Sequence, residues 1–218
     1  MSSIRLVLAS ASPARLATLR QAGLSPEVVV SGVDESGWSG LAPGGLALAL
    51  AAAKGTAVAA RLDPSADDGG DVTVVIGCDS VLELDGRAYG KPETADVAVQ
   101  RWQRMRGRSG ILHTGHHVLV QRGANQQSRT VGAATTVHFA DLSDAEVEAY
   151  VATGEPLAVA GAFTVDGLGG PFVRGIEGDY HNVVGISLPL LRVLLGELGV
   201  AWTDLWVGSV RRGGGPTA

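Results

Sequence analysis

One segment restricts the fold of this chain more than any other. Val72 to Ile76 is an unbroken run of β-branched residues, without the alternation of apolar and polar side chains that a half-exposed strand shows. Such a run is typical of a strand that is buried on both faces of its sheet. Segments of strand and helix character alternate along the rest of the chain, so we predict an α/β fold.

The other expected elements are separated by turn signals. Asp85-Gly86 predicts a hairpin turn into a strand that returns towards Tyr89, and Ser143 with Glu146 forms the pattern of a helix-capping box. The glycine-rich segment 161–178 suits a tight loop between short strands. We expect strands at 4–8, 27–31, 81–84, 115–121 and 131–139, a polar turn at 123–128, helices at 46–62, 96–105, 143–151 and 188–198, and an exposed acidic insertion at 63–71.

Length and hydropathy bound the organisation of the chain. Its 218 residues, 45% of them hydrophobic, are enough for one large core or two small ones. We predict a single domain over residues 1–218, with a flexible tail at 212–218. No apolar run approaches the roughly 18 residues that a membrane span needs, and no signal-type segment opens the sequence. We therefore expect a cytoplasmic protein without a membrane partner, and the lone cysteine, Cys78, agrees with a reducing compartment.

The net charge argues against one large class of partner. At -5, the chain lacks the basic balance with which a general nucleic-acid binder displaces counterions from many phosphates. A single nucleotide in a local basic pocket remains compatible with this charge.

The segment from Ser10 to Arg15 has the composition of an anion site at a helix start. Ser10 and Ser12 supply hydroxyl groups, Pro13 favours a first helical turn, and Arg15 follows within that turn. Unpaired backbone N–H groups beside a guanidinium group bind phosphate readily. An ordinary serine cap is the alternative, and the GxxxxGK[ST] phosphate-binding pattern is absent.

Three charged side chains stand where charge is costly. Asp79 follows the buried strand, at the sheet edge where open α/β folds hold their ligands; its alternative role is to close a turn. Lys54 is the single charge in an apolar helix, and it either extends to solvent or points its ammonium group at an anion. Lys91, between Gly90 and Pro92, has a fixed place on a short loop, although a surface lysine is the default interpretation.

A metal site is expected from two of the carboxylates. Glu35 and Asp79 offer the oxygen ligands that magnesium prefers, with water and the phosphate oxygens of a substrate completing the shell. The alternative is that Asp34 and Glu35 form a solvated acidic pair.

Histidine and cysteine chemistry is not expected. His116 and His117 are adjacent in a predicted strand and therefore point to opposite faces, which speaks against a histidine metal site with His113. Cys78 is interpreted as a packing residue, because the sequence places no histidine beside it to activate a nucleophile.

Short motifs follow one another in a fixed order from about residue 4 to residue 195. They are Ser10-Ala-Ser12-Pro13-Ala-Arg15, Val33-Asp34-Glu35, Ala53-Lys54, Gly77-Cys-Asp79-Ser80, Gly90-Lys91-Pro92, Thr114-Gly115, Gly154-Glu155-Pro156, Ala160-Gly161-Ala162-Phe163 and Tyr180-His181-Asn182-Val183-Val184-Gly185. Each is weak alone, but together they resemble the Maf family of nucleoside triphosphate pyrophosphatases. The resemblance implies an elongated α/β fold, with a mixed central sheet flanked by helices and two lobes around a cleft, similar to the inosine triphosphate pyrophosphatases.

The resemblance also implies an activity. Maf-type enzymes hydrolyse nucleoside triphosphates to the monophosphate and pyrophosphate with a divalent cation (Mg²⁺, Mn²⁺ or Co²⁺), as house-cleaning of non-standard nucleotides, and are commonly homodimers. Carried over by position, the phosphate-binding residues fall on Ser10, Ser12, Arg15, Lys54 and Lys91, the proton-accepting aspartate on Asp79, and the acidic residue of the early loop on Glu35. We expect Asp79, Lys54 and Lys91 to be the catalytic residues, and Glu35 and Asp79 to be the metal ligands.

Base preference and turnover are left open. Three positions set the base in the family, with arginine, threonine and glutamine in one group and tryptophan, glutamine and glutamate in another. Here they hold Ala14, Ser80 and Asp166, which match neither set. We expect these residues to contact the base, and Asp166 favours a base edge that carries hydrogen-bond donors. The alternative function is a nucleotide-binding regulator of septum formation with little turnover, although retention of Asp79 with both lysines favours catalysis.

Overall fold

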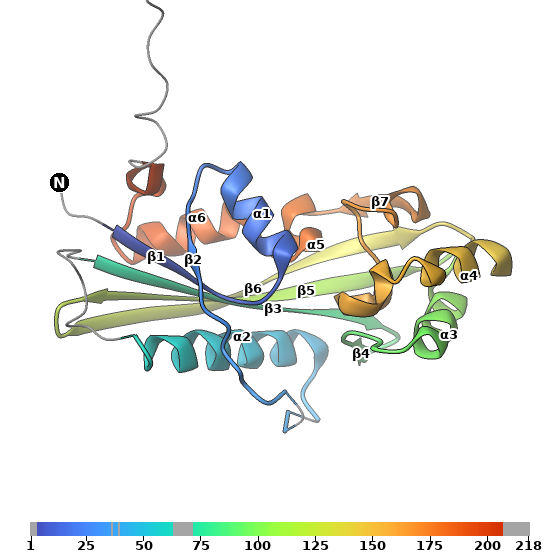
Figure 1. Ribbon diagram of the computed structural model, residues 1–218, viewed down its shortest axis with the longest axis horizontal. Coiled ribbons are helices and arrows are strands. Elements are labelled where there is room, and N and C mark those ends of the chain that lie inside the picture. Colours follow the sequence, from blue (N-terminus) through green and yellow to red (C-terminus); the bar gives the residue numbers. More distant parts are fainter. Residues whose placement is uncertain (1–3, 36, 39, 63–71, 207–218) are drawn as a thin grey trace, which may run out of the picture.

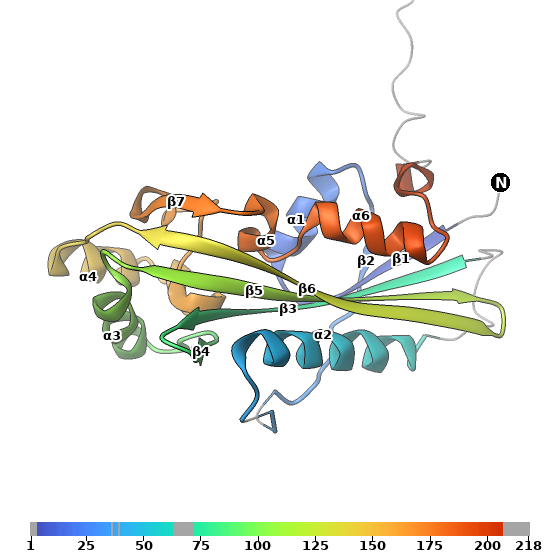
Figure 2. The same ribbon diagram turned by 180° about the vertical axis from the view of Figure 1, so that it is seen from behind.

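In the part of the chain that the structure describes, a mixed sheet of seven strands runs through the length of the molecule, and helices cover both of its faces (Figures 1 and 2). The computed structural model describes residues 4–35, 37–38, 40–62 and 72–206. The sheet and its flanking helices confirm the predicted α/β class. The predicted insertion at 63–71 and tail at 212–218 lie outside the described residues.

The strands and helices have the following bounds. The strands are β1 (Ile4–Ala9), β2 (Glu27–Val28), β3 (Val72–Leu84), β4 (Arg87–Tyr89), β5 (Ser109–Arg122), β6 (Asn125–Phe139) and β7 (Val173–Glu177). The α-helices are α1 (Pro13–Gln21), α2 (Pro43–Ala59), α3 (Ala95–Met105), α4 (Asp144–Ala152), α5 (Tyr180–Val184) and α6 (Leu188–Glu197). Short 3₁₀ turns are η1 (Glu155–Ala158), η2 (Ala160–Ala162), η3 (Gly170–Phe172) and η4 (Trp202–Trp206).

Strand β3 lies at the centre of the sheet and is longer than predicted. The sheet order is β2-β1-β3-β5-β6-β7, and β5 pairs with β3 from Thr73 to Glu83. On the opposite edge, β1 runs parallel to β3 up to Gly77, and β4 runs antiparallel to it from Leu82. Within the described residues, 78–81 therefore have no strand partner on that edge. The sheet is open there, between two strands that pair with the same edge of β3.

This pairing corrects the position predicted for Asp79. It does not follow the end of a strand, because pairing with β5 keeps the backbone of β3 extended through Leu84. Asp79 instead lies two residues after Gly77, the last residue of β3 that pairs with β1. Asp79 was therefore correctly predicted to follow the parallel part of β3, but the prediction that the strand ends there was wrong.

Other element boundaries differ from the predictions for similar reasons. The turn expected at 123–128 is only two residues long, because Gln126 to Ser128 pair with β5 while their side chains stay exposed. Helix α2 begins and ends three residues earlier than predicted, with Pro43 in its first turn. Strand β2 has only two residues, and the segment 161–178 contains the turns η2 and η3 before β7. The Asp85-Gly86 hairpin turn and the Ser143–Glu146 capping box are confirmed.

Two glycines bring α2 close to the sheet. A Cβ atom on Gly115 would collide with the carbonyl oxygen of Ala47, and one on Gly77 with that of Ala51. No larger residue fits at either position while the helix stays where it is. Helix α2 therefore lies directly on β3 and β5 (Figure 2). This brings its only lysine, Lys54, next to Asp79 of β3.

Among the described residues, the apolar core has two large clusters and a smaller one, around Val75 and Val58, between the sheet and α2. One large cluster joins β1, β3 and β5 to α1 and α6, and includes Ile76, Leu191 and Leu194. The other large cluster surrounds Trp102 of α3 and Phe139 of β6, at the end of the sheet where α4 packs. Among the residues described, no helix is long and apolar enough to cross a membrane.

Candidate active site

A pocket of about 960 Å³ opens at the unpaired edge of β3. It is lined by residues of β1, α1, α2 and β3, by the segment 30–38, by the β4–α3 connection, and by residues 158–166 and 183–185. The pocket thus has the predicted position, in a cleft between two parts of the fold. It is lined by every residue that the sequence predicted for the site: Ser10, Ser12, Ala14, Arg15, Glu35, Lys54, Asp79, Ser80, Lys91 and Asp166.

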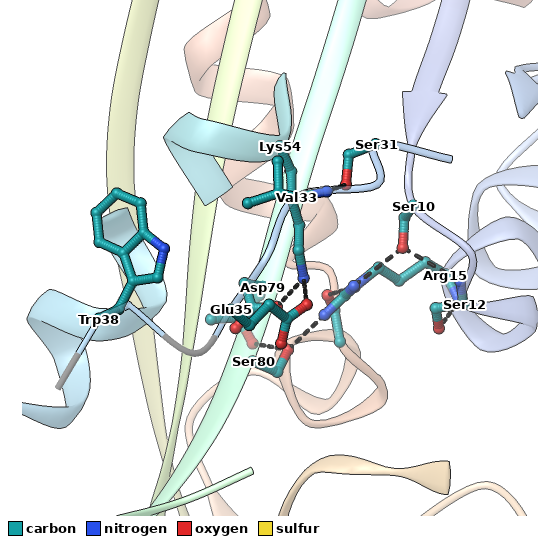
Figure 3. Close-up of polar contacts among 12 residues, drawn as sticks. Ser10, Ser12, Arg15, Ser31, Val33, Glu35, Trp38, Lys54, Asp79 and Ser80 are labelled. Atoms are coloured by element: carbon teal, nitrogen blue, oxygen red, sulfur yellow. Dashed lines mark hydrogen bonds and ion pairs between the residues drawn. The ribbon is translucent and has the colours of Figure 1, made fainter. Parts of the chain in front are cut away.

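The first wall is built around Arg15, which is 8% exposed. Its Nη1 donates to Ser10 Oγ at 3.0 Å, its Nη2 to Ser80 Oγ at 2.9 Å, and its Nε to the carbonyl of Gly185 at 2.7 Å (Figure 3). Within the described part of the chain, no carboxylate pairs with this guanidinium group. A buried cation held only by neutral oxygens favours a bound anion.

Ser10 and Ser12 have different local roles. Ser12 caps α1, since its Oγ accepts from the N–H of Arg15 at 3.4 Å. Ser10 Oγ accepts from the N–H of Ser12 at 3.2 Å and from Arg15. The capping alternative is therefore correct for Ser12, and both hydroxyls still line the pocket beside the N-terminus of α1.

The floor of the pocket is an ion-pair cluster. Lys54 Nζ lies 2.5 Å from Asp79 Oδ1 and 2.6 Å from Glu35 Oε1 (Figure 3). The side chains of Lys54 and Asp79 are only 12% and 11% exposed, whereas that of Glu35 is 49% exposed. Lys54 therefore does not extend to solvent, and Asp79 does not close a turn. Glu35 is not merely a solvated acid.

The remaining predicted residues lie on the walls and rim. Ser80 follows Asp79 on β3 and therefore points to the other face of the sheet, where its Oγ meets Arg15. Lys91 and Asp166 are exposed, and neither forms an ion pair with any described residue. Ala14, half-buried, lies on the first turn of α1.

A protein-family model described as Maf-like protein matches residues 5–198. The chain belongs to the Maf-like family. A curated protein of Salinispora tropica named nucleoside triphosphate pyrophosphatase is 59% identical to this Maf-like chain over 93% of the chain and 88% of that relative. Proteins of the same name from Streptomyces avermitilis and Cutibacterium acnes are 56% and 52% identical, each over 93% of the chain and 94% of the relative.

Glu35 and Asp79 of this Maf-like site carry oxygen donors of the type that hard divalent cations take. Glu35 and Asp79 converge on one ammonium group, so their carboxylate oxygens already share a positive charge. No group of three or more histidine, cysteine, aspartate or glutamate side chains in the described residues is arranged to hold a metal. Two carboxylates suit a cation that takes its other ligands from water and phosphate.

The buried histidines and cysteine of the Maf-like chain are structural. His116 and His117 point to opposite faces, as predicted: His116 accepts from the N–H of Ser187 at 2.8 Å, and His117 bonds to Thr130 Oγ1 at 2.8 Å. Burial, and then the charge of Arg15, lower the pKa of His116 to about 4. Burial raises the pKa of the Cys78 thiol to about 12, so this cysteine packs as a neutral side chain.

Glu155, for which the sequence predicted no role, organises the loop beside the pocket. Glu155 accepts hydrogen bonds from Tyr150 Oη at 2.9 Å and Thr164 Oγ1 at 2.5 Å, and from the N–H groups of Leu168 at 2.9 Å and Gly169 at 3.0 Å. These bonds hold the loop that carries Asp166. The Gly154-Glu155-Pro156 motif was the available signal, but its partners are distant hydroxyl and backbone groups that no local pattern identifies.

Proposed function

We propose that this chain hydrolyses nucleoside triphosphates to nucleoside monophosphates and pyrophosphate. The observation that carries the proposal is one pocket with an unpaired buried cation, Arg15, on its wall and a buried carboxylate, Asp79, on its floor. The name of its Maf-like relatives supports the same reaction. A triphosphate needs cations along its chain, and its hydrolysis needs a group that accepts a proton from water.

The residues that line the pocket divide into phosphate-binding groups and metal ligands. Arg15, the Ser10 and Ser12 hydroxyls and the N-terminus of α1 bind phosphate oxygens on one wall. Lys54 and Lys91 neutralise charge on the phosphates, as positioned cations that need no reorganisation. Glu35 and Asp79 would hold a divalent cation (Mg²⁺, Mn²⁺ or Co²⁺), whose charge withdraws electrons from the phosphate oxygens.

The hydrolytic step uses Asp79 as general base. Its carboxylate accepts a proton from a water molecule, and the water oxygen forms a new bond to the α-phosphorus. The bridging phosphoanhydride bond breaks and pyrophosphate leaves. Lys54, at 2.5 Å from Asp79 Oδ1, holds this carboxylate in a fixed orientation before the substrate binds.

Substrate choice is part of the same proposal. Ala14, Ser80 and Asp166 line the pocket and contact the base, and house-cleaning of non-standard or modified nucleotides is the proposed purpose. A cytoplasmic location, a homodimer and the absence of a nucleic-acid partner stay predictions.

Pyrophosphate release from a panel of standard and modified nucleoside triphosphates tests the function. Each is assayed with magnesium, manganese or cobalt, for the wild type and for Asp79→Asn. The amide cannot accept the proton, so we expect turnover to fall by at least about 100-fold, with nucleotide binding and the melting temperature retained.

The matched control is Asp85→Asn, in the exposed hairpin turn outside the pocket, where asparagine accepts the positive φ of 53°. This control should keep full activity. Full activity in Asp79→Asn would refute the mechanism. If the wild type binds nucleotides and hydrolyses none of the panel, the binding-regulator alternative replaces the proposed function.

A further inference from the structure

A buried arginine outside the pocket is hydrogen-bonded to the loop that carries Lys91. Arg101 lies on α3 and is 8% exposed. Its Nη1 donates to the carbonyl oxygen of Gly90 at 2.5 Å, and its Cζ lies 5.1 Å from the centre of the Tyr89 ring. No carboxylate of the described residues pairs with it, and its Nε is buried without a hydrogen-bond partner. Burial of this charge is therefore costly, and no ion pair offsets the cost.

The connection from β4 to α3 is restrained at successive residues. The Gly90 carbonyl accepts a second hydrogen bond, from the N–H of Gly161 at 3.1 Å. Pro92 is buried and has a fixed φ, and Glu93 adopts a left-handed φ of 65°. Between these restraints, Lys91 projects an exposed side chain that lines the pocket. The hydrogen bonds to the Gly90 carbonyl therefore fix the backbone position of Lys91.

We propose that Arg101 is a positioning residue for Lys91. It holds the Gly90 carbonyl, so that the Lys91 ammonium group stays directed at the bound phosphates. The inference rests on the proposed function, in which Lys91 binds phosphate. A charged donor binds a carbonyl more strongly than a neutral one, which accounts for a guanidinium group at a buried site. Without Arg101 the Gly161 bond remains, so the turn loosens and does not unfold.

A double-mutant cycle separates this role from a general structural one. The variants are Arg101→Met, Lys91→Ala and the double variant, with Arg104→Met as the control on the exposed side of α3. Methionine keeps the apolar volume and removes the hydrogen bond to Gly90. We expect Arg101→Met to lower kcat/KM for the preferred triphosphate by about tenfold in the wild-type background and by less than about twofold when Lys91 is already alanine.

Two further variants, Arg101→Lys and Arg104→Met, distinguish a positioning role of Arg101 from a general effect on stability. Arg101→Lys should recover part of the loss, since its ammonium group can still donate to Gly90, and Arg104→Met should change kcat/KM by less than about twofold. Should Arg101→Met fail to fold, Arg101→Lys replaces it in the cycle. Equal losses in both backgrounds would overturn the inference while leaving the proposed function intact.

Failure of the proposed function gives a different result from failure of the positioning role, because the wild type itself then shows no turnover. If the wild type releases no pyrophosphate, the same cycle is measured on the Kd of a non-hydrolysable α,β-methylene triphosphate, and the same non-additivity is expected. Additive changes in Kd, or no binding by the wild type, would reject the positioning role of Arg101.

Discussion

At the scale of single residues, the site is defined by how its charges are shared. Lys54 pairs with two carboxylates that would otherwise repel each other, whereas Arg15 has no carboxylate partner among the residues that the structure describes. One cation therefore keeps Asp79 and Glu35 together, while the other is held by neutral oxygens. This division of charge suits the proposed polyphosphate substrate, which would bind Arg15 and approach the carboxylates that we propose as metal ligands.

A buried histidine makes the stability of the fold depend on pH. The pKa of His116 falls from 6.5 to about 4, because of burial and then the nearby charge of Arg15. Between these values the unfolded chain binds the extra proton and the folded chain does not, so stability decreases as the pH falls from 6.5 to 4. The full penalty at pH 4 is about 3 kcal/mol in the free energy of unfolding.

Urea unfolding between pH 7 and pH 4 measures this penalty. We compare the wild type with His116→Gln, whose amide oxygen can still accept from Ser187 and does not titrate. The variant should lose less stability on acidification, although it is less stable at pH 7. His117, whose pKa is also lowered by burial, contributes equally to both proteins. Parallel pH profiles for the two proteins would contradict the assignment.

At the scale of elements, the approach of α2 to the sheet decides where Lys54 lies. Gly115 and Gly132 face each other across β5 and β6, yet only Gly115 lies under the α2 backbone. We expect Gly115→Ala to lower the free energy of unfolding by about 2 kcal/mol or more, because its methyl group would push α2 away from the sheet. Displacement of the helix should also lower kcat/KM, since Lys54 moves with it.

Gly132→Ala is the matched control for this prediction. Its methyl group would lie 3.5 Å from the Leu48 side chain, an ordinary packing distance. We expect its unfolding free energy to change by less than about 1 kcal/mol and its activity to be unchanged. Denaturant unfolding with the pyrophosphate assay measures both variants. A Gly115→Ala protein as stable as Gly132→Ala would show that α2 tolerates the displacement.

At the scale of the whole molecule, β3 and β5 run through both large apolar clusters. Leu194 belongs to the cluster under α6, and Trp102 to the cluster beside α4. Because continuous strands connect the two clusters, they should unfold in one cooperative transition, as the predicted single domain requires. Leu194→Ala should therefore lower the unfolding free energy of both, by about 2–5 kcal/mol.

Two spectroscopic probes test this cooperativity. Far-ultraviolet circular dichroism follows the whole fold. Near-ultraviolet circular dichroism, recorded in a Trp202→Phe background because Trp202 packs against the α6 cluster, follows mainly the aromatic cluster of Trp102, Phe139 and Tyr150. Both transitions should shift together in Leu194→Ala. A near-ultraviolet transition that stays in place would mean that the two clusters unfold separately.

Local signals in the sequence determined the class of fold, most of the helices, the hairpin turn at Asp85-Gly86 and the capping box at Ser143. These features depend on residues within a few positions of one another, so local conformational preference decides them. The charged residues of the site could also be predicted from the sequence. Burial of a charge is costly, so a charged residue in an apolar segment indicates a functional position.

Only the tertiary structure decided how these parts meet. The length of β3 and the short turn after β5 depend on pairing with strands distant in sequence, which overrides local polarity. The pairing of Lys54 with Asp79 and Glu35 depends on how closely α2 approaches the sheet, and the contact of Arg101 with Gly90 depends on the packing of α3. Packing and hydrogen bonds between residues far apart in the sequence determine these arrangements, and local sequence patterns do not predict such contacts.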